Sequence, residues 1–148
     1  MARIVYDVER IGPWVCERAG GDWIAGRGTG IGLERDGVLV AGTLFEDFNG
    51  ANVLMHVAAE PGRQWLNLTY LNTCFDYPFN QLGCRRVTGI VPSVNTDALR
   101  FDLHLGFEQE AVLKDAHPEG DLIVLRMTRE QCRWIGARNG QIVRASST

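Results

Sequence analysis

The chain has 148 residues, of which 45% are hydrophobic and 22% charged, values typical of one globular domain. Its formal net charge of −3 disfavours nucleic acid as a partner, and no apolar run predicts a membrane helix or a signal peptide, so we expect a cytoplasmic protein with one domain over residues 1–148. The four widely spaced cysteines contain no CxxC pair, which predicts reduced thiols and no metal site.

Residues 1–30 are expected to form a short strand, a helix and a glycine-rich loop. The sequence RIVY alternates like a strand, and residues 8–18 have helical spacing interrupted by Gly12 and Pro13, so the helix should be short or broken. The following AGGDWIAGRGTG contains five glycines, which predicts a mobile loop of the kind that often forms a lid.

The next segment, up to Ala59, predicts an antiparallel meander of three strands. The dipeptides Asp36-Gly37 and Asn49-Gly50 separate the strands and favour the positive φ angles of type I′ hairpin turns. The third strand, 52–59, is apolar on both faces apart from His56, so it should lie in the centre of the sheet with both faces covered.

A strand–helix–strand unit is expected after Pro61-Gly62. Helical spacing runs from Trp65 to Leu82, with a kink predicted at Pro78 and a stop at Gly83. The strand RRVTGIV follows, and a connection of this length predicts that it lies parallel to the strand before the helix.

The stretch VNTDALRFDLHLGF predicts a helix of about three turns, capped by Asn95 and ended by Gly106. At 100° per residue, Asn95 and Asp102 lie within about 20° of each other beside the apolar stripe. A closing hairpin is expected next, and residues 129–134 are expected to form a last short helix before the polar tail.

The order of these elements resembles the GNAT family of N-acetyltransferases, and within it the ribosomal-protein acetyltransferase branch common in bacteria and their phages. The most specific pieces are NTDALRFDLHLGF and the preceding FDYPFNQLGCRRVTGIV, and the resemblance covers residues 31–128. It implies an α/β (α+β) fold in which helices cover both faces of a central mixed sheet. That sheet should have six to seven mostly antiparallel strands and one parallel pair that splays apart.

The resemblance also implies acetyl-CoA as the cofactor, held as an extra strand between the splayed pair with its pyrophosphate at the start of the following helix. The sequence departs from the family pattern there, because Trp65 and Asn67 stand where small residues are usual. The expected cofactor-binding residues are Val57, Ala58, Gly62, Arg63, Gln64, Trp65, Asn95 and Phe101.

Candidate catalytic residues follow from the same resemblance. Many relatives carry a Tyr as general acid where this chain has Asp102, and an ionised Asp would need a raised pKa to donate a proton. The general base could be Glu46, Asp47, Glu60 or His56. Glu46 and Asp47 should point to opposite faces, and Glu60 is disfavoured by anion repulsion beside the phosphate loop. We therefore select Glu46, His56 and Asp102.

These features predict an N-acetyltransferase in which an amine attacks acetyl-CoA directly in a ternary complex. The acceptor amine could belong to a protein or to a small molecule, and the sequence does not identify it. The alternative hypothesis is a non-catalytic module of the same fold that binds a protein partner. A homodimer formed through the closing hairpin is also open.

Overall fold

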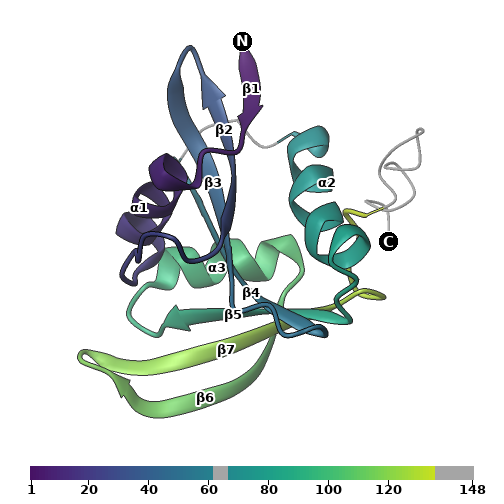
Figure 1. Ribbon diagram of the computed structural model, residues 1–148. Helices are drawn as coiled ribbons and strands as arrows, with labels where there is room; N and C mark the ends of the chain where they lie inside the picture. Colours follow the sequence, from purple (N-terminus) through teal and green to yellow (C-terminus); the bar gives the residue numbers. More distant parts are fainter. Residues whose placement is uncertain (62–66, 136–148) are drawn as a thin grey trace.

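A mixed sheet of seven strands in the order β1-β2-β3-β4-β5-β7-β6 organises the fold (Figure 1). The computed structural model describes residues 1–61 and 67–135. The elements in chain order are β1 Ala2–Val5, α1 Val8–Ala19, β2 Thr29–Arg35, β3 Val38–Glu46, β4 Asn52–Ala59, α2 Leu68–Asp76, the π-helical turn Tyr77–Gln81, β5 Arg86–Pro92, α3 Thr96–Leu105, β6 Glu108–His117 and β7 Gly120–Thr128. The predicted fold class, with its one parallel pair of strands, is confirmed.

Helix α1 packs closely on a glycine surface of the sheet. Gly32 and Gly42 are cross-strand partners in β2 and β3. A Cβ added to Gly32 would lie 3.0 Å from Ile11, and one added to Gly42 would lie 2.8 Å from Val15, so side chains there would push the helix away. The helix was expected to be short or broken, but it is continuous through Pro13 because burial of its apolar face outweighs one missing hydrogen bond.

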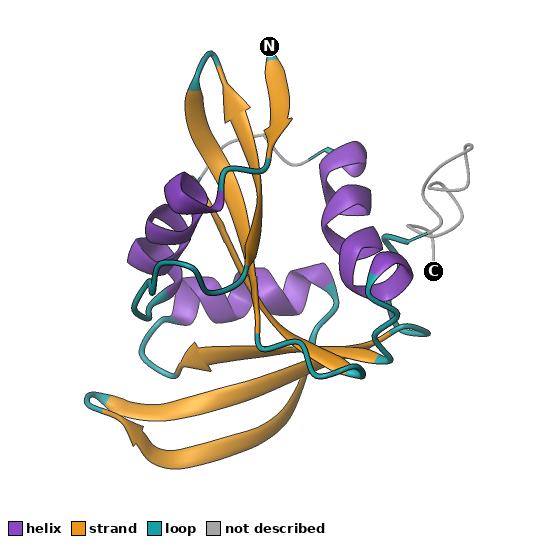
Figure 2. Ribbon diagram, viewed as in Figure 1, coloured by secondary structure: helices purple, strands orange, loops and turns teal. Residues whose placement is uncertain are grey.

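The other face of the sheet carries α2 and α3. Figure 2 shows α1 and α2 on opposite sides of the N-terminal strands, with α3 beside β5. Side chains from α2 and the π-helical turn, including the fully buried Tyr70, Phe75 and Phe79, form one core with β5 and β7. The side chains of α1 form a second, smaller core on the opposite face. No helix in the described ranges could cross a membrane.

The two predicted hairpin turns differ in outcome. Asp36 and Gly37 both have positive φ, 53° and 82°, as a type I′ turn requires. The Asn49-Gly50 prediction is wrong, because β3 ends at Glu46 and a longer loop connects it to β4. The Asn49 side chain instead accepts hydrogen bonds from the amides of Ala51 and Asn52, which gives the backbone a different turn.

The helix between the parallel strands changes its hydrogen-bond pattern at Pro78, where the sequence predicted a kink. Helix α2 begins at Leu68, capped by the Asn67 side chain, which accepts from the Tyr70 amide at 2.7 Å. At Pro78 the chain widens into a π-helical turn, which accommodates the missing proline N–H without a break in the helical path. The predicted end at Gly83 is confirmed by its positive φ of 74°.

The parallel strands β4 and β5 splay apart soon after they begin. Their pairing runs Asn52↔Arg86, Val53↔Val87 and Leu54↔Thr88 and then stops. The Thr88 hydroxyl donates to the Asn52 side chain at 2.7 Å and holds the two strands together at this end, which we call the closed end. Beyond it, Met55–Ala59 pairs only with β3, so the backbone groups of this stretch that point away from β3 have no strand opposite them.

The chain after β5 follows the prediction up to Thr128. Helix α3 is capped by Asn95, which accepts from the Ala98 amide at 3.2 Å, and it ends at the left-handed Gly106. The long hairpin of β6 and β7 closes the sheet. The last predicted helix is wrong: residues 129–134 form turns that pack back on the core, where the Trp134 indole donates to the Leu105 carbonyl at 2.8 Å.

Candidate active site

The structure brings together two of the three predicted catalytic residues, Glu46 and His56. Glu46 ends β3 and His56 lies in the middle of β4, close to the point where β4 leaves β5. The His56 Nε2–H donates toward Glu46 Oε1 at 3.3 Å, and their side chains are 19% and 11% exposed. Burial lowers the pKa of His56 although Glu46 opposes the shift, so the imidazole is neutral at neutral pH and can accept a proton.

A cavity of about 170 Å³ adjoins this pair on the face that α1 covers, and we call it the α1-face cavity. Its lining residues are Val15, Cys16, Ala19, Gly20, Gly21, Asp22, Glu46 and His56. Helix α1 supplies the apolar wall, the glycine-rich loop supplies the rim, and the strands supply the titratable groups. The cavity therefore combines a partly enclosed space with a base that an acceptor amine could reach.

Cys16 is a lining residue that sequence reasoning did not select. Burial raises the pKa of its thiol, and the Glu46 and Asp22 carboxylates raise it further, so the group stays a thiol at neutral pH. A protonated thiol is a poor nucleophile, which disfavours a covalent acyl-cysteine route. The described residues contain no cluster of side chains that could hold a metal ion.

Arg27 of the glycine-rich loop links the two acidic residues at the end of β3. Its guanidinium contacts Asp47 Oδ2 at 2.7 Å and approaches Glu46 Oε2 at 3.9 Å. The prediction that Glu46 and Asp47 point to opposite faces is therefore wrong. Strand alternation ends at Glu46, and Asp47 turns with a positive φ of 58°, which brings both carboxylates to one side.

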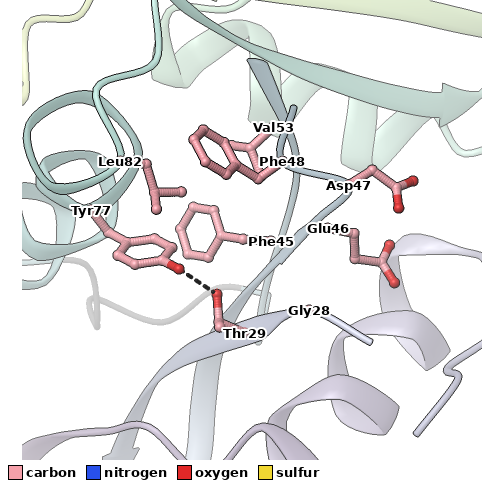
Figure 3. Close-up of a pocket in the computed structure, with 9 residues that line it drawn as sticks. All are labelled: Gly28, Thr29, Phe45, Glu46, Asp47, Phe48, Val53, Tyr77 and Leu82. Atoms are coloured by element: carbon pink, nitrogen blue, oxygen red, sulfur yellow. Dashed lines mark hydrogen bonds between the residues drawn. The ribbon is translucent and has the colours of Figure 1, made fainter. Parts of the chain in front are cut away.

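A second cavity of about 290 Å³ lies at the closed end of the splayed strands (Figure 3), and we call it the aromatic cavity. Phe45 and Tyr77 form an edge-to-face pair with ring centroids 4.9 Å apart, and Thr29 donates to the Tyr77 hydroxyl at 3.1 Å. Figure 3 shows the carboxylates of Glu46 and Asp47 pointing away from these rings. Sequence reasoning did not find this cavity, because it depends on the π-helical turn that places Tyr77.

The third predicted catalytic residue, Asp102, is buried in the second turn of α3. The residue is 8% exposed, and Oδ1 has no hydrogen-bond partner within the described part of the chain. Burial raises the pKa of this carboxyl to about 8, so the protonated form dominates at neutral pH. A neutral carboxyl group can donate a proton, as a general acid at this position of the helix must.

The predicted cofactor-binding residues fall into three groups. Val57 and Ala58 are buried in the part of β4 that has separated from β5. Asn95 caps α3 and also donates to the Arg18 carbonyl of α1 at 3.3 Å, while Phe101 is half-buried against the larger core. The remaining four, Gly62, Arg63, Gln64 and Trp65, lie outside the described residues.

No model of a known protein family matches the sequence, and a search of curated proteins found no relative. Solved structures do match. A GNAT-family acetyltransferase from Bacillus anthracis aligns with a TM-score of 0.56 and 16% identity over 68% of this chain and 66% of that chain. The ribosomal-protein-S18-alanine N-acetyltransferase from Escherichia coli gives 0.60 and 16% over 86% of this chain and 94% of that chain. Spermidine/spermine N-acetyltransferase SpeG from Vibrio cholerae gives 0.64 and 12% over 86% and 92%.

The fold is that of the GNAT acetyltransferases. The chain spans just under two thirds of the Bacillus anthracis structure but nearly the whole of the other two, and the latter alignments cover 86% of this chain. Within this GNAT fold the Glu46–His56 pair lies beside the splayed strands and Asp102 is buried on α3.

Proposed function

We propose that this chain is an acetyl-CoA-dependent N-acetyltransferase that moves an acetyl group to a primary amine by direct attack in a ternary complex. The observation that carries the proposal is the early end of the β4–β5 pairing at Leu54↔Thr88, with His56 and its partner Glu46 beside the opening. The similar structures include acetyltransferases named for a protein alanine and for spermidine and spermine, which supports an amine acceptor.

The opening between the splayed strands fits the pantetheine arm of acetyl-CoA. Backbone groups of Met55–Ala59 that point away from β3 lack a strand partner, and the amides of an extended pantetheine can supply the missing hydrogen bonds. Val57 and Ala58 would hold the arm there, and Asn95 and Phe101 would flank it from α3. We assign the phosphate end to residues 62–65. When bound, acetyl-CoA supplies an acyl group already activated as a thioester.

We assign the proton transfers to His56 and Asp102. The acceptor enters as an ammonium ion and loses its first proton to solvent, and His56 accepts a second proton from the nitrogen as the bond to the acetyl carbon forms. Glu46 orients the imidazole and stabilises its positive charge. Asp102, in its neutral form, donates its proton to the sulfur as the carbon–sulfur bond breaks. His56 then returns its proton to solvent, and Asp102 takes one up.

Thermal unfolding with acetyl-CoA, with CoA, and with adenosine 3′,5′-bisphosphate tests the cofactor site. A ligand at about 100 times its dissociation constant should stabilise the folded chain by about 2.7 kcal/mol. We expect both CoA ligands to raise the melting temperature more than the bisphosphate, which lacks the pantetheine arm. Absence of a shift with either CoA ligand would contradict the proposal and favour the non-catalytic module that binds a protein partner.

Release of free CoA thiol in the presence of primary amines tests the chemistry. The His56→Gln variant should keep its thermal shift with acetyl-CoA but lose about 100-fold in turnover, within the usual range for a general base. His104→Gln is the matched control, because His104 is an exposed histidine on α3. Equal turnover by wild type and His56→Gln would remove His56 from the mechanism.

A further inference from the structure

The charged side chains that line the α1-face cavity are all acidic. Two carboxylates, Asp22 and Glu46, lie along it, and its described lining contains no lysine or arginine. Both carboxylates raise the pKa of the Cys16 thiol, so their negative field extends through the space between them. A cation that enters this cavity is attracted from the rim to the inner end, and an anion is repelled.

Nearby basic side chains balance only part of this charge, because one guanidinium, that of Arg27, is shared between Glu46 and Asp47. Arg18 does not line the cavity; its guanidinium donates to the Trp14 carbonyl at 3.1 Å and contacts Glu60 at 3.2 Å. Arg27 makes its short contact with Asp47 and stands farther from Glu46. With His56 neutral, the cavity has an excess of negative charge that a ligand cation can balance.

Asp22 lies where its carboxylate can distinguish one acceptor molecule from another. Asp22 is exposed at the rim, and no ion pair or hydrogen bond holds its carboxylate within the described ranges. Glu46 already accepts from His56 at the inner end. An acceptor whose reacting nitrogen reaches His56 therefore presents the rest of its short chain to the free carboxylate of Asp22.

The volume of the cavity limits the acceptor to a narrow chain. About 170 Å³ is bounded by the small apolar side chains Val15 and Ala19 on one side, with Gly20 and Gly21 at the rim. An unbranched alkyl chain fits such a space, and its methylene groups can contact the α1 wall. We therefore expect bulky or branched groups beside the amine to be accepted less well.

We propose that the acceptor is a compact cationic alkylamine, and that Asp22 selects cationic amines over amines that carry a carboxylate. This inference rests on the proposed function, because it assigns the acceptor of the same site. Beyond the proposed function, it specifies the sign of the charge at the far end of the acceptor and the residue, Asp22, that recognises this charge.

Three amines of one chain length test the proposal: 1,4-diaminobutane, butylamine and 4-aminobutanoate. We expect kcat/KM to be highest for the diamine and at least about tenfold lower for the amino acid, as expected for a nearby unpaired charge. Asp22→Asn should reduce the ratio of diamine to amino acid about tenfold and change butylamine little. Asp36→Asn is the control, because it removes the same charge from an exposed turn outside the cavity and should leave the ratio unchanged.

Binding measurements separate this inference from the proposed function. The same amines are added to the protein saturated with CoA, and the thermal shift is measured without turnover. A preference for the diamine that is lost in Asp22→Asn upholds the inference even if no acetylation occurs. Three results would overturn the inference while acetyl transfer itself stands. The first is equal turnover of 4-aminobutanoate and the diamine, and the second is an unchanged ratio of the two in Asp22→Asn. The third is faster acetylation of peptide N-termini than of any of the three small amines.

Discussion

Asp102 shows how one residue can reverse an expectation about its chemistry. A carboxyl on an amphipathic helix is usually solvated, but here the residue is 8% exposed and Oδ1 has no hydrogen-bond partner among the described residues. A buried polar atom without a hydrogen bond destabilises the folded state. The presence of such a group in the second turn of α3 supports a functional role, because an apolar residue there would stabilise the fold.

The stability of the protein should therefore depend on pH through Asp102. The pKa is about 8 in the folded state and near 3.8 in the unfolded state, so the folded state keeps a proton that the unfolded state releases. Stability is greatest below the unfolded value and falls as pH rises toward about 8. Asp102→Asn should remove this dependence, so its melting temperature should exceed that of wild type by an amount that grows between pH 5 and pH 8.

The same variant should lose about 100-fold in acetyl transfer while still binding acetyl-CoA, since an amide cannot act as the acid. Wild-type kcat should fall above about pH 8, and this decline should be absent in Asp102→Asn. Parallel melting curves for the two proteins across this pH range would show that Asp102 is ionised in the folded state and would exclude it as the acid.

At the scale of elements, the glycine-rich loop is held by its contact with α1. The predicted mobile loop follows α1 directly, and Trp23 packs over Gly12 of that helix, where an added Cβ would come within 2.4 Å of the Trp23 ring. Arg27 fastens the other end of the loop to Asp47. Gly12, which suggested a break in the helix, instead provides the surface on which the loop is anchored.

Gly12→Ala should displace Trp23 and loosen the rim of the α1-face cavity. The added Cβ would overlap the Trp23 ring, so the clash should cost about 1–3 kcal/mol of unfolding free energy, the usual range for overpacking. Urea unfolding measures this loss, and we also expect KM for the amine to rise. Gly89→Ala is the control, because the nearest atom to its added Cβ is 3.6 Å away, an ordinary contact. Equal stability of the two variants would mean that Trp23 does not anchor the loop.

At the scale of the molecule, the sheet consists of two parts joined at the closed end of β4 and β5. The N-terminal part, β1–β4, has α1 on one face and α2 on the other, while β5, β7 and β6 form the second part (Figure 1). At this closed end β4 and β5 are joined by three residue pairs, by the Thr88–Asn52 hydrogen bond and by the Arg85 amide, which donates to the Ala51 carbonyl at 2.8 Å. The binding of a ligand between them should therefore be visible in the backbone of β4.

Hydrogen exchange provides a direct measurement of this effect. Amides in Met55–Ala59 that point away from β3 should exchange more slowly when acetyl-CoA is added, because the pantetheine arm gives them a hydrogen-bond partner. Amides between β2 and β3 serve as the internal reference and should not change. Protection confined to other parts of the molecule would place the ligand outside the splayed strands.

The sequence by itself determined the features that depend on neighbouring residues. The caps Asn95 and Gly106, the turn at Asp36-Gly37 and the bounds of β4 could be predicted, because they follow from local hydrogen bonds, positive φ angles and short apolar patterns. The order of these elements also carried the resemblance to the GNAT fold. These signals do not depend on how distant parts of the chain pack.

Only the tertiary structure decided which side chains meet and which are removed from water. The contact of Glu46 with His56 depends on strand register, and the pKa of Asp102 depends on burial by the surrounding core. Asp47 left its predicted face because the strand ended one residue before it. Distances between side chains far apart in sequence, and the desolvation that sets their pKa values, arise only when the elements pack together.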